Sequence, residues 1–252
     1  ASFGQDPDSV TVGEMSSTNI GACVEYTRPE NRELSMVFNF HHLKVDYASG
    51  RKWTLMDPDI PALKRLLNDW SLGLQDGGGW NALFWNNHDQ PRAIDRFGDA
   101  DRFRYESATM LATAIHLMRG TPYVYMGEEI GMSDPGYTTI GDYVDIEARN
   151  AFAELVAAGH EADEAFRIVH SKARDNARTP MQWDASASAG FTDGVPWLRP
   201  TNQDEVNVAH EEASGRILPY YRRLIALRKS VPVISGGAYE PYALDDPDIM
   251  AY

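Results

Sequence analysis

Short apolar runs alternate with helical apolar stripes along this chain. Four runs of apolar and β-branched residues, at 9–13, 34–40, 81–85 and 123–126, predict strands. Between them, apolar residues at spacings of three and four predict helices near 20–24, 61–74 and 107–118, the third with Ser107 as its N-cap. A last helix is predicted over about 218–229, after an irregular and helical insertion over about 131–208. Consecutive strand–helix units predict a parallel sheet with right-handed crossovers.

Two architectures fit this pattern. A complete (β/α)₈ barrel takes roughly 250 residues, whereas this chain of 252 residues holds only four such units and an insertion. The chain is therefore either half of a barrel or a small open α/β sheet, and periodicity alone does not separate them. From residue 236 the composition turns to Gly, Pro, Tyr and Asp, which predicts that a further β-rich domain begins at 236–252, after a barrel part at 1–235.

Composition narrows the class of protein. Apolar residues make up 43% and charged residues 24%, as in soluble globular proteins. A net charge of −14 disfavours nucleic acids and anionic membranes as partners. The first residues show no signal-peptide pattern, and no apolar run approaches the roughly 18 residues of a membrane span. The single cysteine, Cys23, excludes an internal disulfide and is expected to be a small apolar residue on a helix. The single cysteine also excludes a cysteine-based zinc cluster, and a reducing cytoplasm fits best. We expect no metal or cofactor.

Candidate chemistry gathers where the predicted strands end. The first strand ends at Glu14, the second at His41, the third at residues 86–89 (NNHD) and the fourth at residues 128–129 (EE). In parallel α/β folds these ends meet at one edge of the sheet. One acidic residue at a strand end is often only the cap of the next helix. Because acidic groups or imidazoles recur at all four ends, a functional site is favoured. Paired carboxyl groups suit acid catalysis at a glycosidic bond, and partial burial of Glu14 is expected to raise its pKa.

Longer motifs resemble a known family. Three stretches resemble the fifth-, seventh- and eighth-strand motifs of glycoside hydrolase family 13. In that order they are residues 12–17 (VGEMSS), 84–92 (FWNNHDQPR) and 120–129 (GTPYVYMGEE). Residues 174–183 (RDNARTPMQW) resemble its oligo-1,6-glucosidase subgroup. Within that subgroup, residues 40–47 (FHHLKVDY) are most similar to trehalose-6-phosphate hydrolases, whereas relatives that cleave neutral isomalto-oligosaccharides tend to carry a Glu-His pair there.

The resemblance implies a fold and a set of roles. It implies the C-terminal half of a (β/α)₈ TIM barrel, with strands five to eight, in a retaining α-glucosidase that works through a covalent glucosyl–aspartate. Glu14 would be the general acid/base, and Asp89 would stabilise the transition state. His88 and Arg174 would bind the glucose at the cleavage point, and Glu147 would lie near the leaving-group sugar.

The chain also departs from the family pattern. It contains no Gly-Phe-Arg-x-Asp motif, which carries the nucleophilic aspartate of the family at the fourth strand. The first strand here corresponds to the fifth strand of the barrel. We therefore expect a missing N-terminal half-barrel or self-association to complete the fold, and the isolated chain to be inactive.

Three hypotheses about function follow. The parent enzyme hydrolyses trehalose 6-phosphate to glucose and glucose 6-phosphate, or it is a neutral oligo-1,6- or α-1,4-glucosidase, or it is a non-catalytic barrel scaffold. The presence of both Glu14 and Asp89 argues against a scaffold. Lys44, Arg51 and Lys52 place three cations within nine residues of an acidic chain. They form either a solvated loop or, as the resemblance favours, a phosphate site with Lys44 and Lys52 as ligands.

Overall fold

The fold is built on one parallel sheet. The computed structural model describes residues 9–252, so the predicted absence of a signal peptide at 1–8 lies outside the described residues. The sheet has the order β1-β2-β3-β4, and each neighbouring pair is parallel. Its strands are β1 (Val12–Met15), β2 (Met36–Asn39), β3 (Asn81–Leu83) and β4 (Thr121–Pro122). Strand order therefore follows chain order, as successive right-handed βα units require.

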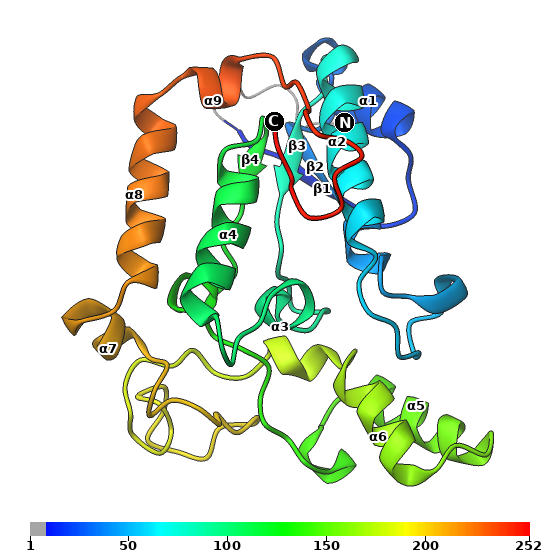
Figure 1. Ribbon diagram of the computed structural model, residues 1–252, viewed down its shortest axis with the longest axis vertical. Coiled ribbons are helices and arrows are strands. Elements are labelled where there is room, and N and C mark those ends of the chain that lie inside the picture. The colour runs from blue at the N-terminus through cyan, green and yellow to red at the C-terminus, as the bar shows by residue number, and fades with distance from the viewer. Residues whose placement is uncertain (1–8) are drawn as a thin grey trace.

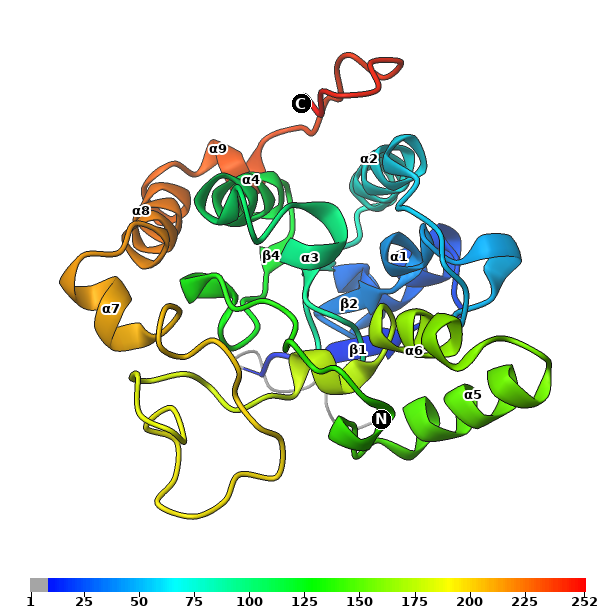
Figure 2. The ribbon, with the colours of Figure 1, turned by 60° about the horizontal axis from the view of Figure 1, so that its bottom comes forward.

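Helices cover one face of this sheet. In Figure 2, α1, α2, α4 and α8 form a layer on the outside of the strands. The helices of the βα units are α1 (Ile20–Thr27), α2 (Ile60–Asp76), α3 (Ala93–Phe97), α4 (Arg104–His116) and α8 (Ile217–Ser230). Asparagine and aspartate side chains cap the first two: Asn19 Oδ1 accepts from Ala22 N at 2.9 Å, and Asp59 Oδ1 accepts from Ala62 N at 2.8 Å. The helices predicted near 20–24, 61–74 and 218–229 are confirmed.

The core lies between these helices and the sheet. One cluster joins α1 and α2 to β2 through Cys23, Val37, Trp70 and Leu74, so Cys23 is the buried helical residue that the sequence predicts. A second cluster joins β3 to α4 and includes Leu83, Trp85, Leu111, Ile115 and Met118. The apolar stripes therefore face the sheet, and the carboxyl edge of the strands remains free for polar side chains.

The insertion after β4 lies beyond that edge, at the bottom of Figure 1. It contains α5 (Ile146–Ala157), α6 (Ala162–His170) and, at its end, α7 (Val208–Ala213), with short 3₁₀ turns that include Glu128–Ile130 and Arg174–Ala177. Tyr143, Ala148, Val169 and Leu198 belong to a separate buried cluster of this segment. The insertion thereby brings its own charged residues over the end of the sheet.

The last residues return to the outside of the helix layer. After α9 (Val233–Gly236), Tyr239 Oη donates to Asn68 Oδ1 of α2 at 2.6 Å. Tyr252 Oη donates to the Ala114 carbonyl of α4 at 2.7 Å. Tyr242 and Ala251 form an isolated antiparallel bridge.

Several predicted boundaries are wrong. β2 covers Met36–Asn39 and not 34–40, and β3 covers Asn81–Leu83 and not 81–85. β1 begins at Val12 and not at residue 9, and the Thr11 N–H donates instead to the Ser35 hydroxyl at 3.1 Å. β4 covers Thr121–Pro122 and not 123–126, because the chain leaves the sheet after Tyr123 N donates to the Leu83 carbonyl at 2.7 Å. Ser107 does not cap α4, which begins at Arg104; its hydroxyl accepts from Asp99 N at 2.9 Å.

A glycine lets β4 approach β3. Gly120 has a φ of 137°, and a Cβ there would lie 2.8 Å from the Asn81 carbonyl oxygen. Any other residue would be strained at this φ and would clash with β3. The position of β4, which precedes the insertion, therefore depends on a glycine at residue 120.

Candidate active site

A cavity opens at the carboxyl edge of the sheet. Its volume is about 360 Å³, and it is lined by Glu14, Ser16, Phe40, Leu43, Lys44, Asp89 and Gln90. These residues come from the ends of β1, β2 and β3 or the segments that follow them. Three residues selected from the sequence, Glu14, Lys44 and Asp89, therefore line one cavity.

Glu14 lies within β1. The expectation that its side chain is partly buried is wrong. Side chains alternate between the two faces of a strand. Met15 packs against the helix-side cluster that contains Cys23, so Glu14 is on the opposite face, together with Val12. That face is not covered by the helix layer, and Glu14 is exposed. Its carboxyl group is therefore free to face a substrate in the cavity.

Two guanidinium groups and an imidazole surround Asp89. Its backbone N–H donates to Asn87 Oδ1 at 2.8 Å, which shapes the loop after β3. Its Oδ1 lies 2.8 Å from Arg178 Nη2 and 3.5 Å from Arg174 Nη1, and its Oδ2 lies 3.3 Å from His88 Nε2. Charge-assisted contacts of this kind fix a carboxylate in position and orientation. The structure thus brings His88 and Arg174, both selected from the motifs, to Asp89.

Arg174 links Asp89 to a second group of charges. Its Nη2 donates to Asp145 Oδ1 at 2.7 Å, and its Nε lies 3.5 Å from Glu147 Oε2. The hydrogen bond from Arg174 to Asp145 raises the pKa of the guanidinium. Burial by itself would raise the pKa of Asp145, but Arg174 outweighs burial and lowers it. Arg174 therefore carries its charge at the centre of a chain of carboxylates.

The two predicted phosphate ligands have different surroundings. Lys44 is exposed on the cavity, where its Nζ donates to the Ser16 carbonyl at 3.1 Å. Lys52 instead donates to both carboxylate oxygens of Glu147, at 2.9 and 3.0 Å. Arg51 is exposed. Lys44 is thus available to an anion in the cavity, whereas Lys52 already has a carboxylate partner.

Sequence reasoning missed two members of this site. Arg178 donates from Nη2 to Asp89 and from Nε to the His88 carbonyl at 2.6 Å, so it anchors both residues. Asp145 caps α5 and holds Arg174. Arg178 belongs to the motif at 174–183, four residues after Arg174, and that spacing could have identified it.

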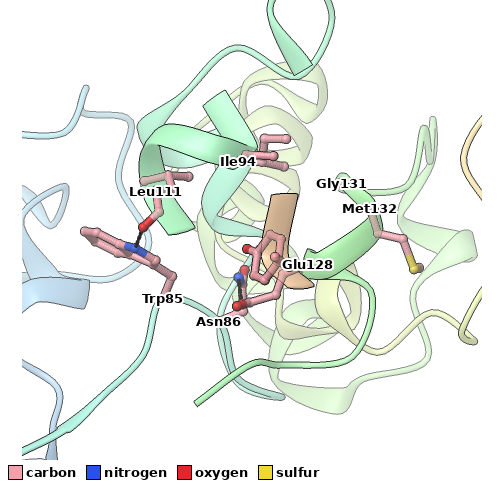
Figure 3. A pocket seen from close by; sticks show the side chains of 9 residues that line it. Trp85, Asn86, Ile94, Leu111, Glu128, Gly131 and Met132 are labelled. Atoms are coloured by element: carbon pink, nitrogen blue, oxygen red, sulfur yellow. Dashed lines mark hydrogen bonds between the residues drawn. The ribbon is translucent and has the colours of Figure 1, made fainter. Parts of the chain in front are cut away.

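A buried carboxyl group supports the Asp89 loop from behind. Figure 3 shows Glu128 facing Asn86 beside a cavity of about 20 Å³. Asn86 Nδ2 donates to Glu128 Oε2 at 2.5 Å, and Asn86 Oδ1 accepts from Ala93 N at 2.7 Å. Burial raises the pKa of Glu128 to about 7. This chain of hydrogen bonds spans the residues on either side of Asp89 and therefore limits the conformations of its loop.

His42 is buried and paired with a backbone carbonyl group. Its Nε2 lies 2.9 Å from the Phe84 carbonyl, and burial lowers its pKa to about 4. A neutral imidazole that donates to a buried carbonyl fixes the start of the Lys44 turn against the end of β3.

Residues 9–252 show neither a candidate metal site nor a candidate membrane span. Within them, no three His, Cys, Asp or Glu side chains converge as a metal site would require. In the same range, no helix is both long and apolar enough to cross a membrane.

The fold and the site define a class. Parallel βα units with two carboxylates, an imidazole and guanidinium groups at the carboxyl edge of the strands are the arrangement of barrel glycoside hydrolases. Residues 1–237 match the family described as "Alpha amylase, catalytic domain". The chain belongs to this alpha-amylase family, glycoside hydrolase family 13.

Individual relatives agree with this assignment. The trehalose-6-phosphate hydrolase of Bacillus subtilis (strain 168) is 49% identical over 247 residues, which are 97% of this chain and 44% of the relative. The oligo-1,6-glucosidase of Halalkalibacterium halodurans is 46% identical over 250 residues, 98% of this chain and 44% of that protein. A crystal structure of a variant of Bacillus licheniformis trehalose-6-phosphate hydrolase superposes with a TM-score of 0.94 at 49% identity, covering 97% of this chain and 44% of that one. The chain thus spans less than half the length of these relatives, and the barrel architecture predicted from the sequence is confirmed.

Proposed function

We propose that this chain forms part of a retaining α-glucosidase that hydrolyses trehalose 6-phosphate to glucose and glucose 6-phosphate. The observation that carries the proposal is the cavity of about 360 Å³, because a pair of carboxyl groups and the exposed ammonium of Lys44 line the same space. Carboxyl groups suit the glycosidic bond, and a cation suits the phosphate. Similarity to two trehalose-6-phosphate hydrolases, at 49% and 50% identity, supports the same substrate.

Each residue has a distinct part in the proposed reaction. Glu14 protonates the glycosidic oxygen as the leaving sugar departs, and its carboxylate then takes a proton from the attacking water. Asp89, held by Arg174 and Arg178, stabilises the positive charge that develops at the anomeric carbon. His88 and Arg174 bind the glucose at the cleavage point, and Glu147 contacts the leaving sugar. The nucleophilic aspartate comes from outside this chain, which contains no Gly-Phe-Arg-x-Asp motif.

The proposal includes the surroundings of the chain. The missing half-barrel or a second copy covers the open face of the sheet, where Val12 is 38% exposed. Residues 236–252 begin a C-terminal β domain, which the bridge between Tyr242 and Ala251 supports. The full protein acts in the cytoplasm, as the single cysteine indicates.

A lysine substitution tests the substrate. In the full-length protein, Lys44→Ala should lower kcat/KM for trehalose 6-phosphate by roughly ten- to a hundred-fold, because a hydrogen bond to a charged group contributes about 1.5–3 kcal/mol. Hydrolysis of an aryl α-glucoside should remain nearly unchanged. Arg51→Ala is the matched control, since Arg51 is an exposed cation of the same loop that does not line the cavity. Equal losses on phosphorylated and neutral substrates would contradict the proposed substrate.

A neutral oligo-1,6-glucosidase is the second candidate. The pairing of Lys52 with Glu147 favours it, because it leaves one of the two predicted phosphate ligands already neutralised. The ratio of kcat/KM for trehalose 6-phosphate to that for isomaltose distinguishes the two enzymes. A ratio well below one would assign the neutral substrate.

A further inference from the structure

Three buried charged side chains lie beside the cavity. Asp46 Oδ1 is 2.8 Å from Arg96 Nη2, and Asp46 Oδ2 is 3.2 Å from Arg96 Nε. Lys172 Nζ donates to the same Oδ2 at 2.5 Å. All three side chains are at most 4% exposed. They come from the segment after β2, from α3 and from the insertion after α6, so one carboxylate joins three separate parts of the chain.

The charges of this cluster do not balance. Burial by itself would raise the pKa of Asp46, but Arg96 and Lys172 outweigh burial and lower it. Burial lowers the pKa of Lys172, and Asp46 opposes that shift. The bidentate contact with Arg96 already neutralises Asp46. Burying a second cation costs solvation energy, so the presence of Lys172 is weak evidence of a contribution to stability.

The cluster also contacts residues that line the cavity. Arg96 Nη2 donates to the Leu43 carbonyl at 2.8 Å, and Arg96 Nη1 donates to Gln90 Oε1 at 3.1 Å. Tyr47 Oη donates to the same Gln90 oxygen at 3.4 Å. Leu43 and Gln90 both line the cavity. Each is the immediate chain neighbour of a proposed site residue, Lys44 for Leu43 and Asp89 for Gln90.

The third segment reaches the site from the insertion. Lys172 precedes Arg174 by two residues, and Arg174 lies 3.5 Å from Asp89. The cluster of Asp46, Arg96 and Lys172 therefore connects the segments that carry Lys44, Asp89 and Arg174. None of its three members lines the cavity itself.

We propose that Asp46, Arg96 and Lys172 form a positioning cluster for the active site. In it, Lys172 holds the Arg174 segment against the Lys44 turn and the Asp89 loop. The inference rests on the proposed function for the reaction that is measured, but the positioning itself is a property of this chain. Its members act through Gln90, Leu43 and Arg174 and do not touch the substrate.

A pair of buried lysines provides the test. In the full-length protein, Lys172→Met should lower kcat by about ten-fold or more on both trehalose 6-phosphate and an aryl α-glucoside, because small misplacements of catalytic groups cost up to about 10²-fold. The KM for the aryl glucoside should change much less. Lys64→Met is the control: Lys64 is also buried, but it donates to the Ala243 and Asp246 carbonyls, which lie away from the cavity. It should leave kcat unchanged at a temperature where both variants are folded.

A double variant tests whether the members act together. Asp46→Asn should also lower kcat, and Asp46→Asn combined with Lys172→Met should be no worse than the more damaging single change. Groups that act as one unit show such non-additive losses. Multiplied losses in the double variant would mean that the two residues act independently, which would contradict a shared positioning role.

Hydrogen exchange separates a failure of this inference from a failure of the proposed function. If the unmodified protein hydrolyses the aryl glucoside but not trehalose 6-phosphate, the substrate assignment fails and the cluster is judged on the aryl glucoside. If it hydrolyses neither substrate, hydrogen exchange tests the cluster. Lys172→Met should then speed the exchange of backbone amides at 41–47, 86–92 and 172–178, whereas Lys64→Met should not. The inference is overturned if Lys172→Met is folded and its kcat lies within about two-fold of that of the unmodified protein. Where no activity is found, it is overturned if hydrogen exchange at these segments is unchanged in Lys172→Met. Equal effects of both lysine variants overturn it as well.

Discussion

Replacing Glu128 by glutamine should change how the stability of the protein depends on pH. Burial raises the pKa of this carboxyl group from its ordinary value of 4.5 to about 7. Between these values the folded chain keeps the proton while the unfolded chain releases it. The folded state then binds more protons, so the free energy of unfolding falls as pH rises. At pH values below 4.5 both states are protonated, and the carboxyl group contributes no pH dependence.

The size of the effect follows from the two pKa values. A pKa difference of one corresponds to 1.36 kcal/mol, so Glu128 should cost about 3 kcal/mol of stability by pH 7.5. Glutamine keeps a carbonyl oxygen that can accept from Asn86 Nδ2, and it does not titrate. The advantage of Glu128→Gln over the unmodified protein should therefore grow by about 3 kcal/mol between pH 4.5 and pH 7.5.

Urea unfolding followed by circular dichroism measures this difference at each pH. Other titrating groups, such as His42, are common to both proteins and cancel in the comparison. Glu154→Gln, at an exposed position of α5, is the control for the Glu-to-Gln change itself. If the curves for Glu128→Gln and the unmodified protein run parallel, the burial argument for Glu128 is refuted.

Three further predictions concern activity. Glu14→Gln in the full-length protein should lower kcat/KM for trehalose 6-phosphate by roughly 10²–10⁴-fold, and less for an aryl glucoside with a good leaving group; hydrolysis at the unmodified rate would exclude Glu14 as the acid. Arg178→Lys should lower kcat by about ten-fold, because a single ammonium cannot reproduce the separate bonds to Asp89 and the His88 carbonyl; unchanged kinetics would show that Arg178 does not support Asp89. The isolated 252-residue chain should hydrolyse no aryl α-glucoside and should self-associate in size-exclusion chromatography with light scattering, because it lacks the nucleophile motif and leaves apolar residues such as Met126 exposed. A stable monomer with activity would contradict both parts.

The sequence predicted the helices better than the strand boundaries. The stripe that contains Leu63 and Leu74 identified α2 because each of its apolar residues packs on one side of a helix. The β-branched residues at 10–11 and the apolar residues at 123–126 have the same local pattern whether or not a neighbouring strand pairs with them. Pairing depends on hydrogen bonds between distant segments, so the starts of these two strands were misplaced by three and two residues.

The motifs also identified most of the charged residues of the candidate site but not their partners. Glu14, Asp89 and Arg174 follow from local patterns, since each stands in a recognisable stretch. The exposure of Glu14 does not follow from a local pattern, because it depends on which face of β1 the helices cover.

By itself, the sequence determined the order of βα units, the buried stripes of the helices, the family and the residue types at the strand ends. These properties lie in the local periodicity and in contiguous motifs. The tertiary structure alone decided which charges meet: Lys52 reaches Glu147 across 95 residues, Arg178 reaches Asp89 across 89, and Lys172 reaches Asp46 across 126. The physical reason is that the parallel crossovers and the insertion bring segments together at one edge of the sheet, and no local pattern records which side chains then lie within hydrogen-bonding distance.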